Sequence, residues 1–221
     1  MTEVTNKQSS GRARILASIR HSLRTESSPN TIAAEYAQIA RTYNASSEQS
    51  AAELLHLLED RLVEYDAGIY RAAEDEIANA IAAILTNRGK HGLVIPHGLP
   101  TAWLPGGFVF EDATGFDAYR LDRSEGVLSG CTVAIAETGS IVLQNVSGQG
   151  ARILSLVPDY HLCVVFARQV VATVPEAFAR LKATATLPTT FISGPSATAD
   201  IEMTRIKGVH GPRFLDVLIV V

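Results

Sequence analysis

Apolar residues in the first part of the chain recur every three or four positions, which is the spacing of one face of a helix. The clearest case follows Ser50, where Leu54, Leu58 and Leu62 form part of a broad apolar face. Arg88 and Gly89 end a further segment rich in Ala and Ile. The pattern predicts helices at residues 11–23, 31–43, 50–65 and 71–87.

From residue 92 onward, short apolar runs separated by Gly and Pro replace the helical spacing, as is typical of strands. Pro175 is placed for the first turn of one further helix, at 174–182. Alternating strands and helices with at least one hairpin predict an α/β protein with a mixed sheet flanked by helices. The predicted strands are 93–95, 108–110, 131–136, 140–143, 162–166, 189–192 and 214–221.

The amino-terminal segment differs from the rest. Ile15, Ile19 and Leu23 lie at spacings of four among arginines, and Ser27-Ser28-Pro29 then forms a linker. We therefore expect a flexible start with an amphipathic helical arm at 1–30. A single domain follows at 31–221, with helices at 31–88 and the sheet core at 89–221. Whether the arm docks on its own chain or on a partner is open.

Composition narrows the function classes. The net charge of −4, with no basic patch, argues against nucleic-acid binding. No apolar run approaches the ~20 residues of a membrane span, and the start lacks a secretory signal, so we expect a cytoplasmic protein. Cys131 and Cys163, the two cysteines, lie in apolar runs and are expected as buried thiols. Two thiols cannot hold an iron–sulfur cluster by themselves.

A polar stretch between the last two predicted strands carries the most chemistry. The spacing predicts a short helix that begins at Ser196 or Thr198 and ends at Gly208. Unpaired N–H groups at a helix start bind anions. Ser193 and its neighbours would add hydroxyl donors to such a site, and Gly194 would allow a ligand to approach the backbone closely. The competing interpretation is that Ser196 or Thr198 only caps the helix.

Two acidic residues and a histidine belong to the same stretch. Asp200 and Glu202 would point about 200° apart on a helix, so at most one of them faces the loop. The alternative is that both carboxylates have no ligand-binding role and only interact favourably with the dipole at the helix start. His210, between two glycine turns, is a candidate proton carrier or ligand, or a turn residue bonded to backbone.

A second break contains Glu137, Thr138 and Gly139, which join two predicted strands in a tight turn. Glu137 is placed either at the mouth of a pocket, as base or ligand contact, or in an ordinary hairpin. The Gly/Ser loop at 144–152 could close over a ligand, although it lacks the Lys of a P-loop. Arg152 is the best anion anchor in the chain, with a structural salt bridge as the alternative.

Three further residues have both a structural and a functional interpretation. His97 and Trp103 follow a predicted strand, at the position where open α/β sheets bind ligands. They are candidates for the rim of a pocket. The favoured alternative is that Trp103 caps the core and His97 faces solvent. His161 enters a strand and is expected to be a core histidine bonded to backbone. No local spacing of ligating residues demands a metal, and we predict none.

Several motifs resemble one known family. They are Ser193-Gly-Pro-Ser-Ala-Thr-Ala-Asp-Ile-Glu202, then Gly208-Val-His-Gly-Pro212, Ala136-Glu-Thr-Gly-Ser-Ile-Val-Leu143, and Arg152 with Ser155-Leu-Val-Pro-Asp-Tyr-His161. Together they resemble the signature of the lactate utilisation protein C family, the LUD-domain proteins, over roughly residues 130–221. Ala197 departs from the family pattern, in which Arg is frequent.

The resemblance implies a fold similar to the CoA-transferase and phosphosugar-isomerase superfamily, a Rossmann-like sandwich. It implies a component of L-lactate utilisation that converts lactate to pyruvate with iron–sulfur partner proteins and holds no cofactor itself. The chain would bind a small carboxylate or another anion, and Glu137 or His210 would move a proton. The expected ligand contacts are Thr138, Gly139, Arg152, Ser193, Gly194, Ser196, Thr198 and Asp200.

Two alternatives stay open. One is a stand-alone enzyme similar to formyltetrahydrofolate cyclo-ligase, a sugar-phosphate isomerase or a CoA-transferase. The other is a non-catalytic scaffold subunit whose loops serve only the fold. The sequence leaves open whether this chain performs a chemical step.

Overall fold

The computed structural model describes residues 11–23, 28–198, 206–208 and 210–221. The chain divides into two compact units, residues 1–43 and 44–221, which are described separately. The first unit contains α1 (Gly11–Leu23) and α2 (Pro29–Gln38). Ser28 caps α2 by accepting a hydrogen bond from the backbone N–H of Thr31 at 3.2 Å. The helix predicted at 11–23 is confirmed, and the one predicted at 31–43 ends earlier, at Gln38.

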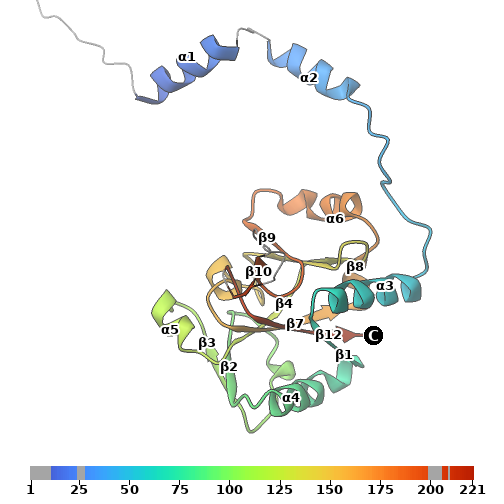
Figure 1. Ribbon diagram of the computed structural model, residues 1–221, viewed down its shortest axis with the longest axis vertical. Coiled ribbons are helices and arrows are strands. Elements are labelled where there is room, and N and C mark those ends of the chain that lie inside the picture. The colour runs from blue at the N-terminus through green and yellow to red at the C-terminus, as the bar shows by residue number, and fades with distance from the viewer. Residues whose placement is uncertain (1–10, 24–27, 199–205, 209) are drawn as a thin grey trace, which may run out of the picture. The chain divides into compact units, whose positions relative to one another are not determined.

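A six-stranded parallel sheet forms the centre of the second unit, in the order β1-β12-β7-β4-β2-β3 (Figure 1). Because all its strands are parallel, their carboxyl ends lie along one edge of the sheet and their amino ends along the other. The strands are β1 (Gly68–Ala72), β2 (Gly92–Ile95), β3 (Val109–Asp112), β4 (Val127–Gly130), β7 (Tyr160–Phe166) and β12 (Phe214–Val220).

A second, four-stranded sheet has the order β8-β5-β6-β9 and mixes parallel and antiparallel pairs. The chain passes from β4 in the first sheet directly to β5 in the second, and it does so again from β7 to β8. The predicted hairpin is the β5–β6 pair. The strands are β5 (Val133–Ile135), β6 (Ser140–Gln144), β8 (Val170–Val171) and β9 (Thr189–Ile192).

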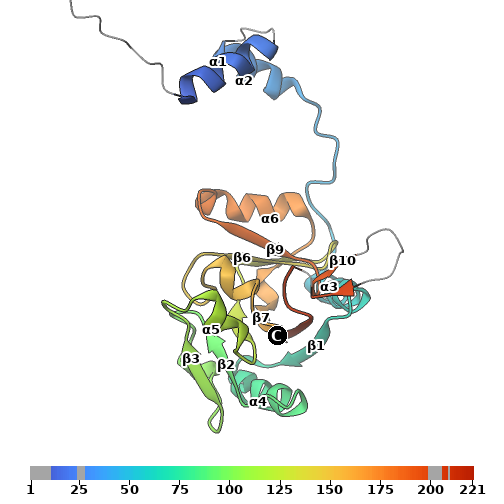
Figure 2. The same cartoon turned by 60° about the vertical axis from the view of Figure 1, so that its left-hand side comes forward.

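Helices cover both sheets, as Figures 1 and 2 show. On one face of the six-stranded sheet lies α4 (Ile77–Asn87), and on the other lie α3 (Ala51–Glu64) and the second sheet. The outer face of the second sheet packs against α6 (Val174–Leu181). Shorter helical turns are α5 (Ala118–Asp122), η1 (Glu74–Glu76), η2 (Thr101–Trp103), η3 (Arg152–Ser155), η4 (Ala167–Gln169) and η5 (Lys182–Thr184).

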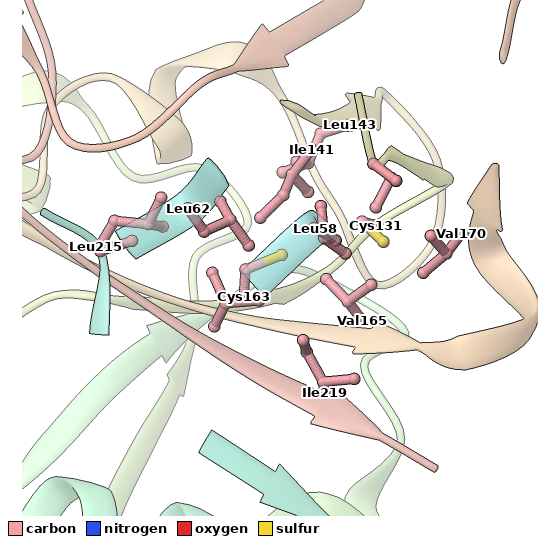
Figure 3. Close-up of a cluster of buried hydrophobic side chains, with 14 residues drawn as sticks. Leu58, Leu62, Cys131, Ile141, Leu143, Cys163, Val165, Val170, Leu215 and Ile219 are labelled. Atoms are coloured by element: carbon pink, nitrogen blue, oxygen red, sulfur yellow. The ribbon is translucent and has the colours of Figure 1, made fainter. Parts of the chain in front are cut away.

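The core between the two sheets is closed by α3. Ser50 begins this helix with a capping box to Glu53, and Leu58 and Leu62 on its apolar face are fully buried. They pack against residues of both sheets and against Cys131, which lies between β4 and β5 (Figure 3). Cys131 and Cys163 are buried free thiols, as expected. The mixed α/β class is thus confirmed, whereas the likeness to the CoA-transferase superfamily stays a prediction.

Two predicted helices are wrong in part or whole. The helix expected at 71–87 begins only at Ile77, and Arg71 lies in the edge strand β1. The helix expected from Ser196 or Thr198 to Gly208 is wrong at both ends that the structure describes. Ala197–Thr198 and Ile206–Lys207 are instead the antiparallel strands β10 and β11, and residues 199–205 lie outside the described residues. No helix among the described residues is both long and apolar enough to span a membrane.

Candidate functional site

The end of α3 brings two predicted loops together. Gly139 and Gly194 both have positive φ angles, 59° and 80°. A Cβ atom on Gly139 would lie 2.7 Å from Cβ of Arg61, and one on Gly194 would collide with the side chain of Tyr65. Both loops therefore lie against the last turns of α3, and each needs glycine there for conformation and for space.

A chain of hydroxyl groups links the same two loops. Thr138 Oγ1 donates to Ser140 Oγ at 2.8 Å, and Ser140 Oγ is 2.7 Å from Ser193 Oγ. The expected convergence of the 137–139 turn with Ser193 and Gly194 is therefore present in the structure. The sequence analysis named Ser140 only as part of a family motif. Ser140 begins β6, directly after the turn that contains Thr138 and Gly139.

Two of the three backbone amides of the 137–139 turn are already used. The N–H of Glu137 donates to the carbonyl of Ala172 at 3.1 Å, and that of Gly139 to Ala136 at 3.3 Å. The Glu137 carboxylate is exposed and makes no hydrogen bond within the described part of the chain. An incoming ligand would thus meet hydroxyls and one carboxylate at this turn, and not a set of unpaired N–H groups.

Ser196 holds the carboxy-terminal segment in place. Its N–H donates to the carbonyl of Pro212 at 2.8 Å, its carbonyl accepts from Gly208 at 2.9 Å, and its hydroxyl accepts from the backbone N–H of His210 at 3.0 Å. This arrangement replaces the helix start that was expected there. It fixes the backbone on both sides of His210, whose side chain is exposed.

His210 lines a pocket of about 540 Å³ beside the amino ends of β7 and β12. Arg213, also in its lining, pairs in two-point fashion with Asp159: Nε to Oδ1 is 2.5 Å and Nη2 to Oδ2 is 2.9 Å. The hydrogen bonds and charge of Asp159 raise the pKa of Arg213. Arg213 is therefore already paired with a carboxylate, and the His210 side chain is exposed at the pocket wall.

Arg152 begins η3 and is exposed. Its Nη1 donates to Thr190 Oγ1 at 3.1 Å, and no carboxylate of the described residues lies within the 4.0 Å ion-pair distance. The salt bridge considered as an alternative is therefore not formed within those residues. Ser155 Oγ donates to the Arg152 carbonyl, and a Cβ on Gly211 would lie 3.9 Å from the Ser155 carbonyl oxygen. Hence η3 adjoins the segment that carries His210.

Two predicted ligand contacts cannot be placed. Thr198 has its backbone in β10, but its side chain is not described. Asp200 lies outside the described residues, as does Glu202. No group of three or more potential metal-ligating His, Cys, Asp or Glu residues occurs within the described part of the chain.

His161 is a core histidine, as predicted, but its partner is a side chain. It is 1% exposed, and its Nε2 lies 2.7 Å from Ser129 Oγ. Its Nδ1 has no hydrogen-bond partner among the described residues. Burial lowers the pKa of His161 to about 4, so the ring is neutral at physiological pH. Trp103 is half-buried and packs against Phe166 with ring centroids 5.7 Å apart.

Sequence reasoning missed a buried ion pair at the amino ends of the strands. Asp216 is fully buried and receives two hydrogen bonds from Arg88, at 2.8 and 2.5 Å, and one from the Tyr160 hydroxyl at 2.8 Å. A Cβ on Gly68, in the neighbouring strand, would collide with the Asp216 carboxylate. The signal was available, since Asp216 is the one charged residue in the apolar run 214–221.

The chain belongs to the LUD domain family, which matches residues 44–220. It is 43% identical over 181 residues to Lactate utilization protein C of Deinococcus radiodurans, covering 80% of this chain and 84% of that protein. Lactate utilization protein C of Halalkalibacterium halodurans is 27% identical, with 77% and 80% covered. The crystal structure of a DUF162 family protein from Deinococcus radiodurans has a TM-score of 0.68 and 37% identity, covering 78% of this chain and 99% of that one. The family resemblance of the motifs is thereby confirmed.

Proposed function

We propose that this protein is a component of an L-lactate utilisation system and works with iron–sulfur partner proteins that oxidise lactate to pyruvate. The names of its relatives, Lactate utilization protein C, support this role. The chain has two cysteines, both buried, and no Gly-x-Gly-x-x-Gly segment for a dinucleotide. The electrons of lactate oxidation would therefore pass through the partner proteins, while this chain binds a small carboxylate.

One observation carries the binding proposal: the Arg152 guanidinium is exposed and has only a neutral hydroxyl, that of Thr190, as its hydrogen-bond partner among the described residues. A guanidinium without a carboxylate partner is free to bind a carboxylate through two parallel N–H groups. The hydroxyl of lactate would pair with one of the hydroxyls on the neighbouring segments, those of Thr138, Ser193 and Ser196.

His210 and Glu137 are the groups proposed to move a proton. Each is exposed, and each lies on a turn whose backbone is fixed by hydrogen bonds, Ser196 holding His210 and Ala172 holding Glu137. A fixed backbone limits the positions of a proton-transferring side chain, which raises its effectiveness. Gly139 and Gly194 contribute by keeping both loops against α3, and Thr198 and Asp200 stay predicted contacts.

Ligand binding by the purified full chain tests the proposal. We expect L-lactate or pyruvate to bind in calorimetric titrations, and Arg152→Gln to weaken binding at least tenfold, about 1.4 kcal/mol. Arg180→Gln is the matched control, because Arg180 is also exposed and donates to a single backbone carbonyl, that of Arg168, at 2.9 Å. Equal binding by all three proteins would reject Arg152 as the anchor. Turnover of sugar phosphates or folates by the isolated chain would favour a stand-alone enzyme instead.

A further inference from the structure

The six-stranded sheet has a switch point that the proposed carboxylate site does not use. From β2 the chain runs to β3 on one side of it, and the next strand of this sheet, β4, lies on the other side. Loops leaving strands at such a point diverge and leave a crevice at the carboxyl ends, where open α/β sheets bind ligands. Here the crevice lies beyond Ile95 of β2 and Asp112 of β3.

A glycine-rich loop (residues 145–151) is held beside this crevice by backbone hydrogen bonds. The Gly148 N–H donates to the carbonyl of His97, and the Gly148 carbonyl accepts from Gly130, both at 2.9 Å. A Cβ on Gly98 would collide with the Ser147 hydroxyl, and one on Gly150 would lie 2.5 Å from Leu154 Cδ1. The close approach makes the crevice a preformed feature and not a cavity that must open first.

A histidine and a carboxylate lie at the rim. His97 Nδ1 is 3.1 Å from Asp112 Oδ2, and the other carboxylate oxygen accepts from the hydroxyl and the N–H of Thr114, at 2.6 and 2.8 Å. These bonds, first that of the Thr114 hydroxyl, lower the pKa of Asp112. An ionised carboxylate only accepts, so the neutral His97 ring carries its proton on Nδ1. Its Nε2 is then an acceptor for a ligand.

The open pocket beside this rim measures about 430 Å³, within the usual range for small-molecule sites. Its walls are largely apolar, and its polar side chains belong to His97, Thr114, Asn145 and Ser147. None of the described residues that line it is Lys or Arg. The apolar lining residues are Pro96, Ala113, Phe116, Val146, Ala151, Ile153 and Leu154.

We propose that this pocket binds an uncharged heteroaromatic ring, such as the base of a nucleoside, with a ring or exocyclic N–H donating to His97 Nε2. A carboxylate or phosphate would lose its hydration without meeting a cation, and a plain hydrocarbon would leave the polar rim unpaired. A flat ring with hydrogen-bonding edges can pack its faces against the apolar walls and pair its edges with the polar side chains at the rim. Asn145 and Ser147 supply complementary donors and acceptors.

The test measures binding of adenosine, guanosine and nicotinamide to the full chain by saturation-transfer NMR and calorimetry, with ribose and inorganic phosphate as comparison probes. We expect at least one of the three ring compounds to bind and the comparison probes not to bind. His97→Ala should weaken the ring compound at least tenfold. If none of the three binds at millimolar concentration, or if ribose or phosphate binds as well as they do, the proposal is overturned.

The chain offers a matched control at the other end of β2. His91 precedes that strand, and its Nδ1 lies 3.4 Å from Glu125 Oε1; its side chain is 88% exposed, against 85% for His97. His91→Ala should leave ring binding unchanged. Ala151→Trp, on an exposed lining residue, should abolish binding without lowering the melting temperature. Equal losses in the two histidine variants, or unchanged binding in His97→Ala, would contradict the assignment.

Discussion

The buried histidine of the central sheet makes the stability of this protein depend on pH in a specific way. His161 is 1% exposed, and burial lowers its pKa from 6.5 to about 4. The unfolded chain therefore binds a proton at this residue below pH 6.5, while the folded chain stays neutral until about pH 4. Stability should be fully present above pH 6.5 and fall as the pH drops from 6.5 towards 4.

The size of the effect follows from the pKa difference. One pKa unit corresponds to about 1.4 kcal/mol, so the full difference is worth about 3 kcal/mol at the acidic end. Between pH 7.5 and pH 5 the expected loss from this one residue is roughly 2 kcal/mol. Most carboxylates titrate below this interval, so they contribute little to it.

Urea unfolding at pH 7.5 and pH 5, followed by the fluorescence of the single tryptophan, Trp103, measures the change. The variant His161→Leu fills similar space and cannot be protonated, so its pH dependence should be smaller than that of the wild type by roughly 2 kcal/mol. The comparison of slopes removes contributions from other residues. If the wild type and the variant lose the same stability between the two pH values, His161 does not titrate as its burial requires.

Three other changes test the fold by urea unfolding. Arg88→Met should cost about 3 kcal/mol because it leaves Asp216 buried without its cation, and Arg88→Met combined with Asp216→Leu should recover most of the loss. Gly194→Ala should lower the free energy of unfolding by roughly 1–3 kcal/mol, because of its φ of 80° and because the new Cβ would collide with Tyr65 at the end of α3. In Gly106→Ala, the control, the new Cβ meets no atom within 4 Å, so the free energy of unfolding should change by less than about 0.5 kcal/mol. Ser50→Ala should cost about 1 kcal/mol by removing the cap of α3.

Local patterns predicted most elements of the fold. The capping residue Ser50 and the leucines after it defined α3. The apolar run at 214–221, interrupted only by Asp216, defined β12, because a parallel strand buried on both faces is apolar along most of its length. β1 was not predicted, because the strand Gly68–Ala72 is short and contains a charged residue, Arg71, which forms an ion pair with Glu59 on α3. Edge strands carry a weaker apolar signal than central ones.

Long-range contacts account for what the sequence could not predict. Ser196 is a residue type that often caps the start of a helix, but its N–H donates to the carbonyl of Pro212, sixteen residues later. Local propensity is a weak guide when such a tertiary bond competes with it. The family resemblance did imply that the Glu137 turn and Ser193 belong to one site, and the hydroxyl contact between Ser140 and Ser193 joins these loops. The part played by α3, which fills the space behind Gly139 and Gly194, depends on packing that no local pattern contains.

Growth on L-lactate tests the proposed function most directly. Deleting the gene in its own host should abolish growth with L-lactate as the carbon source and leave growth on pyruvate intact. The wild-type gene and Arg180→Gln should restore growth, while Arg152→Gln, present at the same protein level, should not. Undiminished growth of the deletion strain on L-lactate would contradict the proposed role, and full rescue by Arg152→Gln would contradict the carboxylate site.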